Sequence, residues 1–328
     1  MEEDTDYLKW LAVASLAATP SIGLAASIID NGTIQLGVDD LGQLNIYTGS
    51  VPSLGGTLPT GLRDMRTGWE ATAPGCLCEG WGVGIGETAE AGWAGNASGV
   101  SNITGVSFAS TPSTATSVTD MGTSLRVTHA FAPSVTADLY EVKVTILNTS
   151  GVDIADLRYT RFMDWDIEPT PFSEYVTIGG TAAATAVLYA GDDGFVSGDP
   201  FASRGPLVPG AEGDFDDSGP ADHGAVFDFG FGVLLAGDSK MFSIFYGASE
   251  NETEAFNALI AVNAEVYSFG QSSDNINGRT SDRSTFIFGF SFVGGVTPPP
   301  PIPLPASALL LFGGLAMLAG LRARRKAA

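Results

Sequence analysis

Short runs of alternating apolar and polar residues make up most of the chain. The period of two, carried by β-branched and aromatic residues, is typical of half-buried antiparallel strands. Glycine, asparagine, aspartate, proline and serine separate the runs, as turn residues do. The pattern predicts strands over residues 33–38, 124–131, 139–147, 157–165, 185–189, 241–246 and 285–293.

One segment has helical periodicity instead. Ser249 and Glu252 have the spacing of a capping box, and apolar residues then recur on one face from Ala255 to Val266. We expect one short amphipathic helix whose apolar stripe packs against the strands.

The strand pattern runs from residue 27 to 295 with no clear linker, which predicts one large antiparallel β-sandwich of the supersandwich type. An alternative is a division near residue 110. Residues 92–119 are rich in Gly, Ser, Thr and Ala, and could form an irregular loop or a weak domain boundary.

The N-terminus departs from the strand pattern. Lys9 precedes an apolar run over residues 10–18, and small residues follow up to Ala26. This order predicts an export signal peptide over residues 1–26, cleaved after Ala25 or Ala26. Four acidic residues precede Lys9 where a positive region is expected, so the signal has an atypical start.

The C-terminus has three parts: a proline-rich linker over 296–305, an apolar segment over 306–321 and a basic tail over 322–328. This order predicts a transmembrane helix with a cytoplasmic tail. At about 1.5 Å per residue the segment spans about 24 Å, less than the ~30 Å hydrocarbon core, which suits transient membrane residence. The alternative is a C-terminal helix buried in the body. The residues of the membrane stop are Arg322, Arg324, Arg325 and Lys326.

The string IPLPASALLLFGGLAMLAGLRARRKAA over residues 302–328 resembles the PEP-CTERM class of bacterial sorting signals. Its motif is that of the VPLPA variant, with isoleucine in place of valine. The resemblance implies that an exosortase-type membrane enzyme recognises and removes the tail, usually in Gram-negative bacteria that make extracellular polysaccharide. The body would then reach the cell surface or the medium. The motif residues are Ile302, Pro303, Leu304, Pro305 and Ala306.

The charge of the chain narrows its partners. There are 37 acidic and 15 basic residues, a net charge of −22. This excess disfavours nucleic acid and anionic membrane surfaces as partners, and it favours solubility and attraction of divalent cations.

The two cysteines, Cys76 and Cys78, are separated by one residue. In an oxidising compartment they can form a disulfide that closes a small ring, and two free buried thiols are the alternative. A structural zinc site would need a second cysteine pair or nearby histidines, and the sequence around them has neither.

The first carboxylate cluster is Asp164, Asp166 and Glu168. On a strand, alternation would place all three on one face, where like charges repel. Such a group persists if a cation such as calcium binds it, if one member is protonated for acid–base catalysis, or if the side chains fan out into water. Arg158 and Arg161 lie nearby in sequence and offer ordinary ion pairing as a further alternative.

The second cluster is Asp214, Asp216, Ser218 and Asp222, spaced like the start of a calcium loop. An EF-hand needs a bidentate glutamate at position twelve, where this chain has Ala225, so an EF-hand is excluded. A looser calcium site and an acidic surface turn both remain open.

Tryptophans Trp69, Trp81 and Trp93 occur in a glycine-rich run and could stack on sugar rings, although core packing is the commoner fate of tryptophan. Nucleophile-elbow, phosphate-loop and zinc-hydrolase motifs are missing from the sequence. We therefore expect a non-enzymatic structural or interaction protein, with extracellular polysaccharide as a candidate partner. The alternative is a carbohydrate-binding module or a carboxylate-based carbohydrate-active enzyme.

Overall fold

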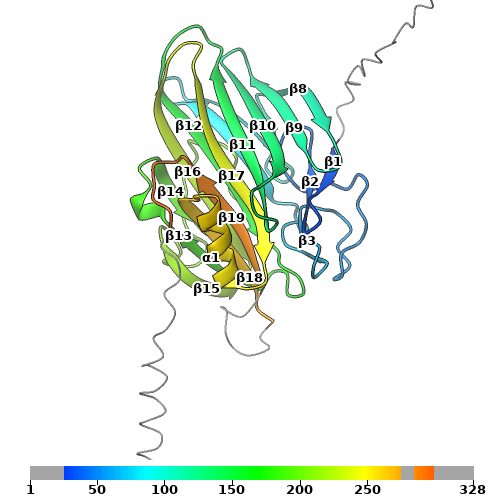
Figure 1. The fold of residues 1–328 in the computed structure, drawn as a ribbon. Helices are drawn as coiled ribbons and strands as arrows, with labels where there is room; N and C mark the ends of the chain where they lie inside the picture. Colours follow the sequence, from blue (N-terminus) through cyan, green and yellow to red (C-terminus); the bar gives the residue numbers. More distant parts are fainter. Residues whose placement is uncertain (1–25, 275–283, 299–328) are drawn as a thin grey trace, which may run out of the picture.

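The computed structural model describes residues 26–274 and 284–298. In these residues the chain is mainly β, with three antiparallel sheets and one α-helix (Figure 1). Among the described residues, no helix is long and apolar enough to cross a membrane. The signal-peptide cleavage region before residue 26, the membrane segment and the basic tail lie outside the described residues, so those expectations stay predictions.

The largest sheet has nine strands, and its strand order places sequence-distant segments side by side. Across the sheet the strands are β15 (Phe215–Ala221), β13 (Glu174–Gly179), β18 (Val266–Ser272), β19 (Thr285–Ser291), β17 (Ser239–Ser249), β11 (Leu139–Asn148), β10 (Leu125–Pro133), β9 (Ala115–Met121) and β8 (Ile103–Ser110).

The two smaller sheets have six and four strands. The six-stranded sheet consists of β14 (Val187–Gly191), β16 (His223–Leu234), β12 (Ile154–Trp165), β5 (Glu79–Ile85), β6 (Glu90–Gly95) and β7 (Gly99–Ser101). The four-stranded sheet consists of β1 (Ser27–Asp30), β2 (Ile34–Val38), β3 (Leu62–Asp64) and β4 (Trp69–Glu70).

An aromatic core joins the nine-stranded and six-stranded sheets. The ring of Phe227 on β16 lies 4.9 Å from that of Phe290 on β19, centroid to centroid. The ring of Tyr159 on β12 lies 4.9 Å from that of Phe242 on β17. Edge-to-face aromatic pairs of this kind add to the stability gained by burying the rings. The result is a β-sandwich-like arrangement, in agreement with the predicted fold class.

All seven predicted strand segments coincide with or overlap observed strands. The irregular loop proposed for residues 92–119 is wrong, because this stretch contributes to β6, β7, β8 and β9. Side chains on β9 alternate strictly between buried and part-exposed, so small residues there still follow a strand pattern. Strands β8 and β9 pair directly at Ser110 and Ala115, which leaves no domain boundary near residue 110.

The helix α1 (Glu252–Ala261) packs on the outer face of the nine-stranded sheet, where Leu259 is fully buried (Figure 1). It begins later than predicted. Its N-cap is Asn251, whose side chain accepts a backbone hydrogen bond from the first turn. The capping box at Ser249 is wrong because this residue ends β17 and donates its hydroxyl hydrogen to Asp138 at 2.9 Å.

A buried ion pair connects the sheets. On β12, Arg161 donates to Glu79 of β5 at 2.6 Å, and both side chains are fully buried. The same carboxylate accepts hydrogen bonds from the hydroxyl of Tyr246 on β17 at 3.0 Å and from the N–H of Leu44. Arg161 also donates to the carbonyl of Gly42 at 3.1 Å. This pair therefore joins the two large sheets and the segment that follows β2.

We expect Glu79→Gln to destabilise the protein by about 3 to 5 kcal/mol, because it leaves the Arg161 guanidinium buried without a counterion. Chemical denaturation measures this loss. The matched control is Asp120→Asn, which removes a carboxylate from the solvent-exposed Arg126 pair and should cost much less, because water already screens that pair. Equal losses in the two variants would contradict this account of the core.

Candidate metal centre

The end of β12 places two carboxylates together. The N–H of Asp164 donates to the carbonyl of Cys78 at 2.7 Å, and the N–H of Asp166 donates to that of Ala71 at 2.8 Å. Between them, Trp165 points into the core and donates its indole N–H hydrogen to Ser268. Alternation along the strand therefore directs Asp164 and Asp166 away from Trp165.

A third carboxylate reaches this place from the junction of β15 with β16. Asp222 lies between β15 and β16, and the next residue, His223, is paired with Trp165 across the six-stranded sheet. Carboxylate oxygens of Asp164, Asp166 and Asp222 all lie within 4.8 Å of one another. The first two side chains are 1% and 0% exposed, whereas Asp222 is exposed, so the trio extends from the interior to the surface.

A fourth carboxylate, Glu174 at the start of β13, lies beside the trio. It is fully buried, and its backbone is paired with Ala221, the residue before Asp222. One of its oxygens accepts the N–H of Ile167 at 3.2 Å. Its charge also acts on Asp166. We call Asp164, Asp166, Asp222 and Glu174 the carboxylate cluster.

Several oxygens of the carboxylate cluster have no hydrogen-bond partner. They are Oδ1 of Asp164, both Oδ atoms of Asp166 and Oε2 of Glu174. The N–H of Phe172 is near enough to lower the pKa of Asp166 slightly, but it is not in hydrogen-bond geometry. Buried polar atoms are normally paired, and no backbone N–H or Ser, Thr or Tyr hydroxyl of the described residues pairs with these oxygens.

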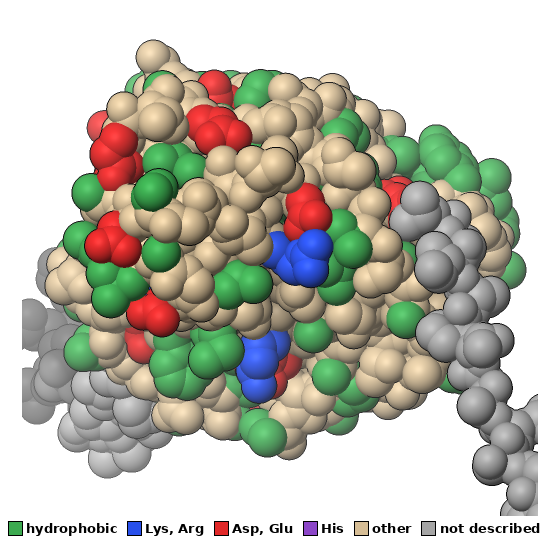
Figure 2. All heavy atoms as spheres, turned by 90° about the horizontal axis from the view of Figure 1, so that it is seen from above, with side chains coloured by type: hydrophobic (Ala, Val, Ile, Leu, Met, Phe, Trp, Pro, Cys, Tyr) green, Lys and Arg blue, Asp and Glu red, His purple; other side chains and the backbone are tan. Residues whose placement is uncertain are grey.

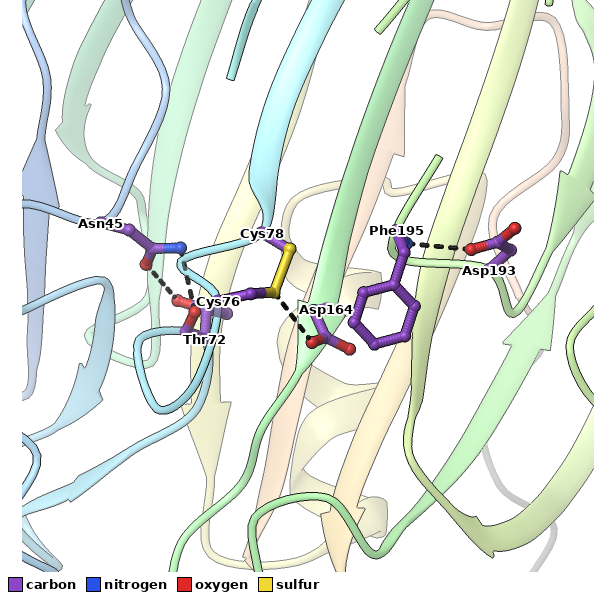
Figure 3. Close-up of a disulfide and its surroundings, with 7 residues drawn as sticks. All are labelled: Asn45, Thr72, Cys76, Cys78, Asp164, Asp193 and Phe195. Carbon is purple, nitrogen blue, oxygen red and sulfur yellow. Dashed lines mark hydrogen bonds between the residues drawn. A yellow bond between two sulfur atoms is a disulfide. The ribbon is translucent and has the colours of Figure 1, made fainter. Parts of the chain in front are cut away.

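The nearby disulfide does not donate a hydrogen bond to these oxygens either. Cys76 and Cys78 are bonded to each other, which agrees with the predicted pairing. Oδ2 of Asp164 lies 3.5 Å from Sγ of Cys76, the dashed contact in Figure 3. Because a disulfide sulfur carries no hydrogen, this contact cannot be a hydrogen bond. The disulfide therefore donates no hydrogen bond to Asp164.

Other buried carboxylates are compensated. Arginines face three of them, in the pairs Arg161–Glu79, Arg63–Glu70 and Arg204–Asp228. The fourth, Asp192, has Nδ1 of His223 at 3.0 Å and accepts hydrogen bonds from the N–H groups of Leu207 and Val208. On the surface, Figure 2 shows one face on which the few Lys and Arg side chains lie beside acidic ones. Among the residues described, no Lys, Arg or His forms an ion pair with the carboxylate cluster.

Burial and mutual repulsion perturb these acids. Burial raises the pKa of Asp164 far above its usual range, and the charge of Asp166 raises it further. The pKa of Asp166 is raised by burial and then by the charge of Glu174. Burial raises the pKa of Glu174 to about 9. Without a cation, the cluster therefore retains protons at neutral pH.

Glu168 does not join Asp164 and Asp166, which corrects the predicted trio. Asp166 directly follows the last strand residue, Trp165, whereas Glu168 lies three residues beyond it, where alternation no longer sets the direction of a side chain. Its carboxylate accepts hydroxyl hydrogens from Ser53 and Thr57, both at 2.6 Å. Burial alone would raise the pKa of Glu168, but these hydrogen bonds and two backbone N–H groups lower it. It is a satisfied structural carboxylate.

The predicted calcium loop is also not formed, because its residues build the edge strand β15. Asp214 instead accepts hydrogen bonds from the N–H and hydroxyl of Thr181 at 2.8 and 2.6 Å. Asp216 is exposed on the strand, and Ser218 is paired with Val176 of β13. Of the four predicted ligands, Asp222 alone lies with the carboxylate cluster.

The three tryptophans do not form an exposed patch. Trp81 is fully buried and donates its indole N–H hydrogen to the carbonyl of Leu41 at 3.0 Å. Trp69 is half-buried against the main core. Trp93 is half-buried, and its side chain would collide with any side chain added at Gly198. Core packing therefore accounts for Trp81 and Trp69, and Trp93 packs against Gly198.

The sequence analysis missed Glu174. It lies in TPFSEYV, a segment with no acidic spacing of its own, and strand pairing brings it to Asp222.

No protein-family model matches the chain, and no match is found among curated proteins.

In the presence of a chelator, we expect the wild-type protein to lose stability relative to Asp166→Asn as the pH rises. Unfolded carboxyl groups ionise at about pH 4, whereas in the folded protein burial raises the pKa of Asp166 to about 8 and that of Glu174 to about 9. Between these limits the folded state binds more protons than the unfolded state, so a rise in pH favours unfolding.

The stability due to the raised pKa values is fully present below about pH 4 and is lost by about pH 9. Chemical denaturation across this range measures the difference between the two proteins. Parallel stability curves for wild type and variant would show that the side chain of Asp166 is not crowded by its neighbours.

Proposed function

We propose that the protein is an exported, non-enzymatic protein of the cell surface or extracellular matrix. The observation that carries this proposal is the disulfide between Cys76 and Cys78, the two cysteines of the chain. Disulfides persist in oxidising compartments outside the cytosol and are rare inside it. The bond supports the export that the signal-like residues 1–26 and the C-terminal residues 302–328 predict.

The C-terminal segment gives the route. An exosortase-type enzyme would recognise Ile302 to Ala306, and the apolar segment 306–321 would hold the chain in the membrane until cleavage. The body would then be released to the envelope surface or the medium. Extracellular polysaccharide is the partner that this route favours. The acidic charge of the chain supports a solvated, extracellular role.

The geometry favours a non-enzymatic role over glycoside hydrolysis. Glycosidases place two carboxyl groups about 5 to 10 Å apart on either side of an accessible sugar. Here the oxygens of Asp164 and Asp166 lie within 4.8 Å, and both side chains are almost completely buried. A buried group of crowded acids suits a structural role better than the binding of a sugar ring between them.

Intact-mass measurement after cell fractionation tests the export route. We expect a mature species in the envelope or medium that starts after Ala25 or Ala26 and lacks the basic tail. Replacing Pro303 and Pro305 by alanine should leave an unprocessed, membrane-bound chain. The matched control, Pro298→Ala, changes a proline outside the recognised motif and should be processed normally.

Full-length chain dissolved in the cytoplasm would contradict this proposal. Release of reducing sugar from extracellular polysaccharide by the purified mature protein would contradict its non-enzymatic part.

A further inference from the structure

The carboxylate cluster needs positive charge that the described chain does not supply. Asp164, Asp166 and Glu174 are at most 1% exposed, and each has an oxygen without a partner. Leaving such groups ionised and unpaired in the interior is very costly. The nearest contacts from other elements do not help: Asp193, from the loop after β14, adds negative charge, and Cys76 offers a disulfide sulfur.

We propose that the carboxylate cluster binds one calcium ion. Two independent observations point to it: the convergence of three aspartate side chains within 4.8 Å, and the unpartnered Oε2 of the buried Glu174 beside them. This site does not depend on the export route. The site takes Asp164 and Asp166 from the first predicted cluster and Asp222 from the second. Glu174 belongs to neither predicted cluster.

The donor atoms determine the class of metal. Carboxylate oxygens suit hard cations such as calcium, magnesium and manganese. The sulfurs near Asp164 belong to a disulfide and carry no thiolate charge, so the set does not suit zinc or copper. Calcium accepts many carboxylate oxygens in irregular arrangements, whereas magnesium requires near-octahedral geometry and retains its water. Three clustered aspartates, with Glu174 beside them, therefore favour calcium.

The position of the cluster gives the ion access and a structural effect. Asp222 is exposed, so an ion can enter from solvent and lose its water against Asp166 and Asp164. The four residues come from the end of β12, the start of β13 and the junction of β15 with β16. Calcium would thus tie an edge of the nine-stranded sheet to the six-stranded sheet. It would also replace the protons that the cluster otherwise retains.

Calorimetric titration and thermal unfolding of the purified, chelator-treated full chain test the proposal. Calcium chloride is the probe, with magnesium chloride at equal ionic strength for comparison. We expect one saturable calcium site per chain, a rise in melting temperature on calcium addition, and weaker binding of magnesium.

Asp166→Asn should lower the calcium affinity at least tenfold. At about pH 9, where Asp166 would be ionised, the same substitution should raise the melting temperature of the chelated protein, because it removes repulsion. If the side chain of Asp166 only stabilised the fold and bound no ion, Asp166→Asn would lower that melting temperature instead. Asp222→Asn, at an exposed position that tolerates substitution, gives a second test of affinity. The matched control is Asp238→Asn, an exposed aspartate in the turn between β16 and β17, and it should bind calcium like the wild type.

The absence of a saturable calcium signal would overturn the proposal. So would equal calcium affinity in Asp166→Asn, Asp222→Asn and the wild type. Tighter binding of magnesium than of calcium would overturn the assignment of the metal.

Discussion

Compensation of buried negative charge is the constraint on which this fold depends. The Arg161–Glu79 pair lies at the centre of the molecule, where it also holds the hydroxyl of Tyr246 and the N–H of Leu44. Taking either charge from water is expensive, and the pair is tolerated because its geometry and added hydrogen bonds offset that cost. Contacts between the two large sheets and the segment after β2 therefore depend on one cation, Arg161.

At the end of the same strand, buried carboxylates have no cation beside them among the described residues. Three residues after Arg161, β12 carries Asp164, and Asp166 follows just beyond the strand, in surroundings equally buried but without a described cation. The chain has few cations to spare, since acidic residues outnumber basic ones by 37 to 15. Glu168 shows another solution, a carboxylate stabilised by hydroxyl and N–H donors. The carboxylate cluster has neither solution: its buried members retain protons or, as we propose, share a calcium ion.

Local pattern predicted the strands whose side chains alternate strongly in polarity, such as β11 and β12. It failed for β6 to β9, where glycine and small residues weaken the contrast although β9 still buries every second side chain. The helix was predicted in place, but its start was wrong because Ser249 belongs to the preceding strand. Pairing in β17 overrides a capping signal that is only four residues long.

The candidate site was predictable in part for the same reason. Asp164 and Asp166 were recognisable because strand alternation is local. Glu168 was assigned to them wrongly, since it lies three residues beyond the end of the strand. Asp222 was grouped with residues that belong to the edge strand β15, which ends just before it. The contribution of Glu174 depends on the pairing of β13 with β15, which brings together residues nearly 50 positions apart along the chain. Such contacts arise from tertiary structure and leave no spacing to recognise in the sequence.

A crystal structure of the protein grown with calcium tests the central claim most directly. The account predicts a metal ion with oxygens of Asp164, Asp166 and Asp222 about 2.3 to 2.6 Å away, the range of calcium–oxygen distances. Carboxyl groups hydrogen-bonded to one another, with no ion between them at saturating calcium, would contradict it.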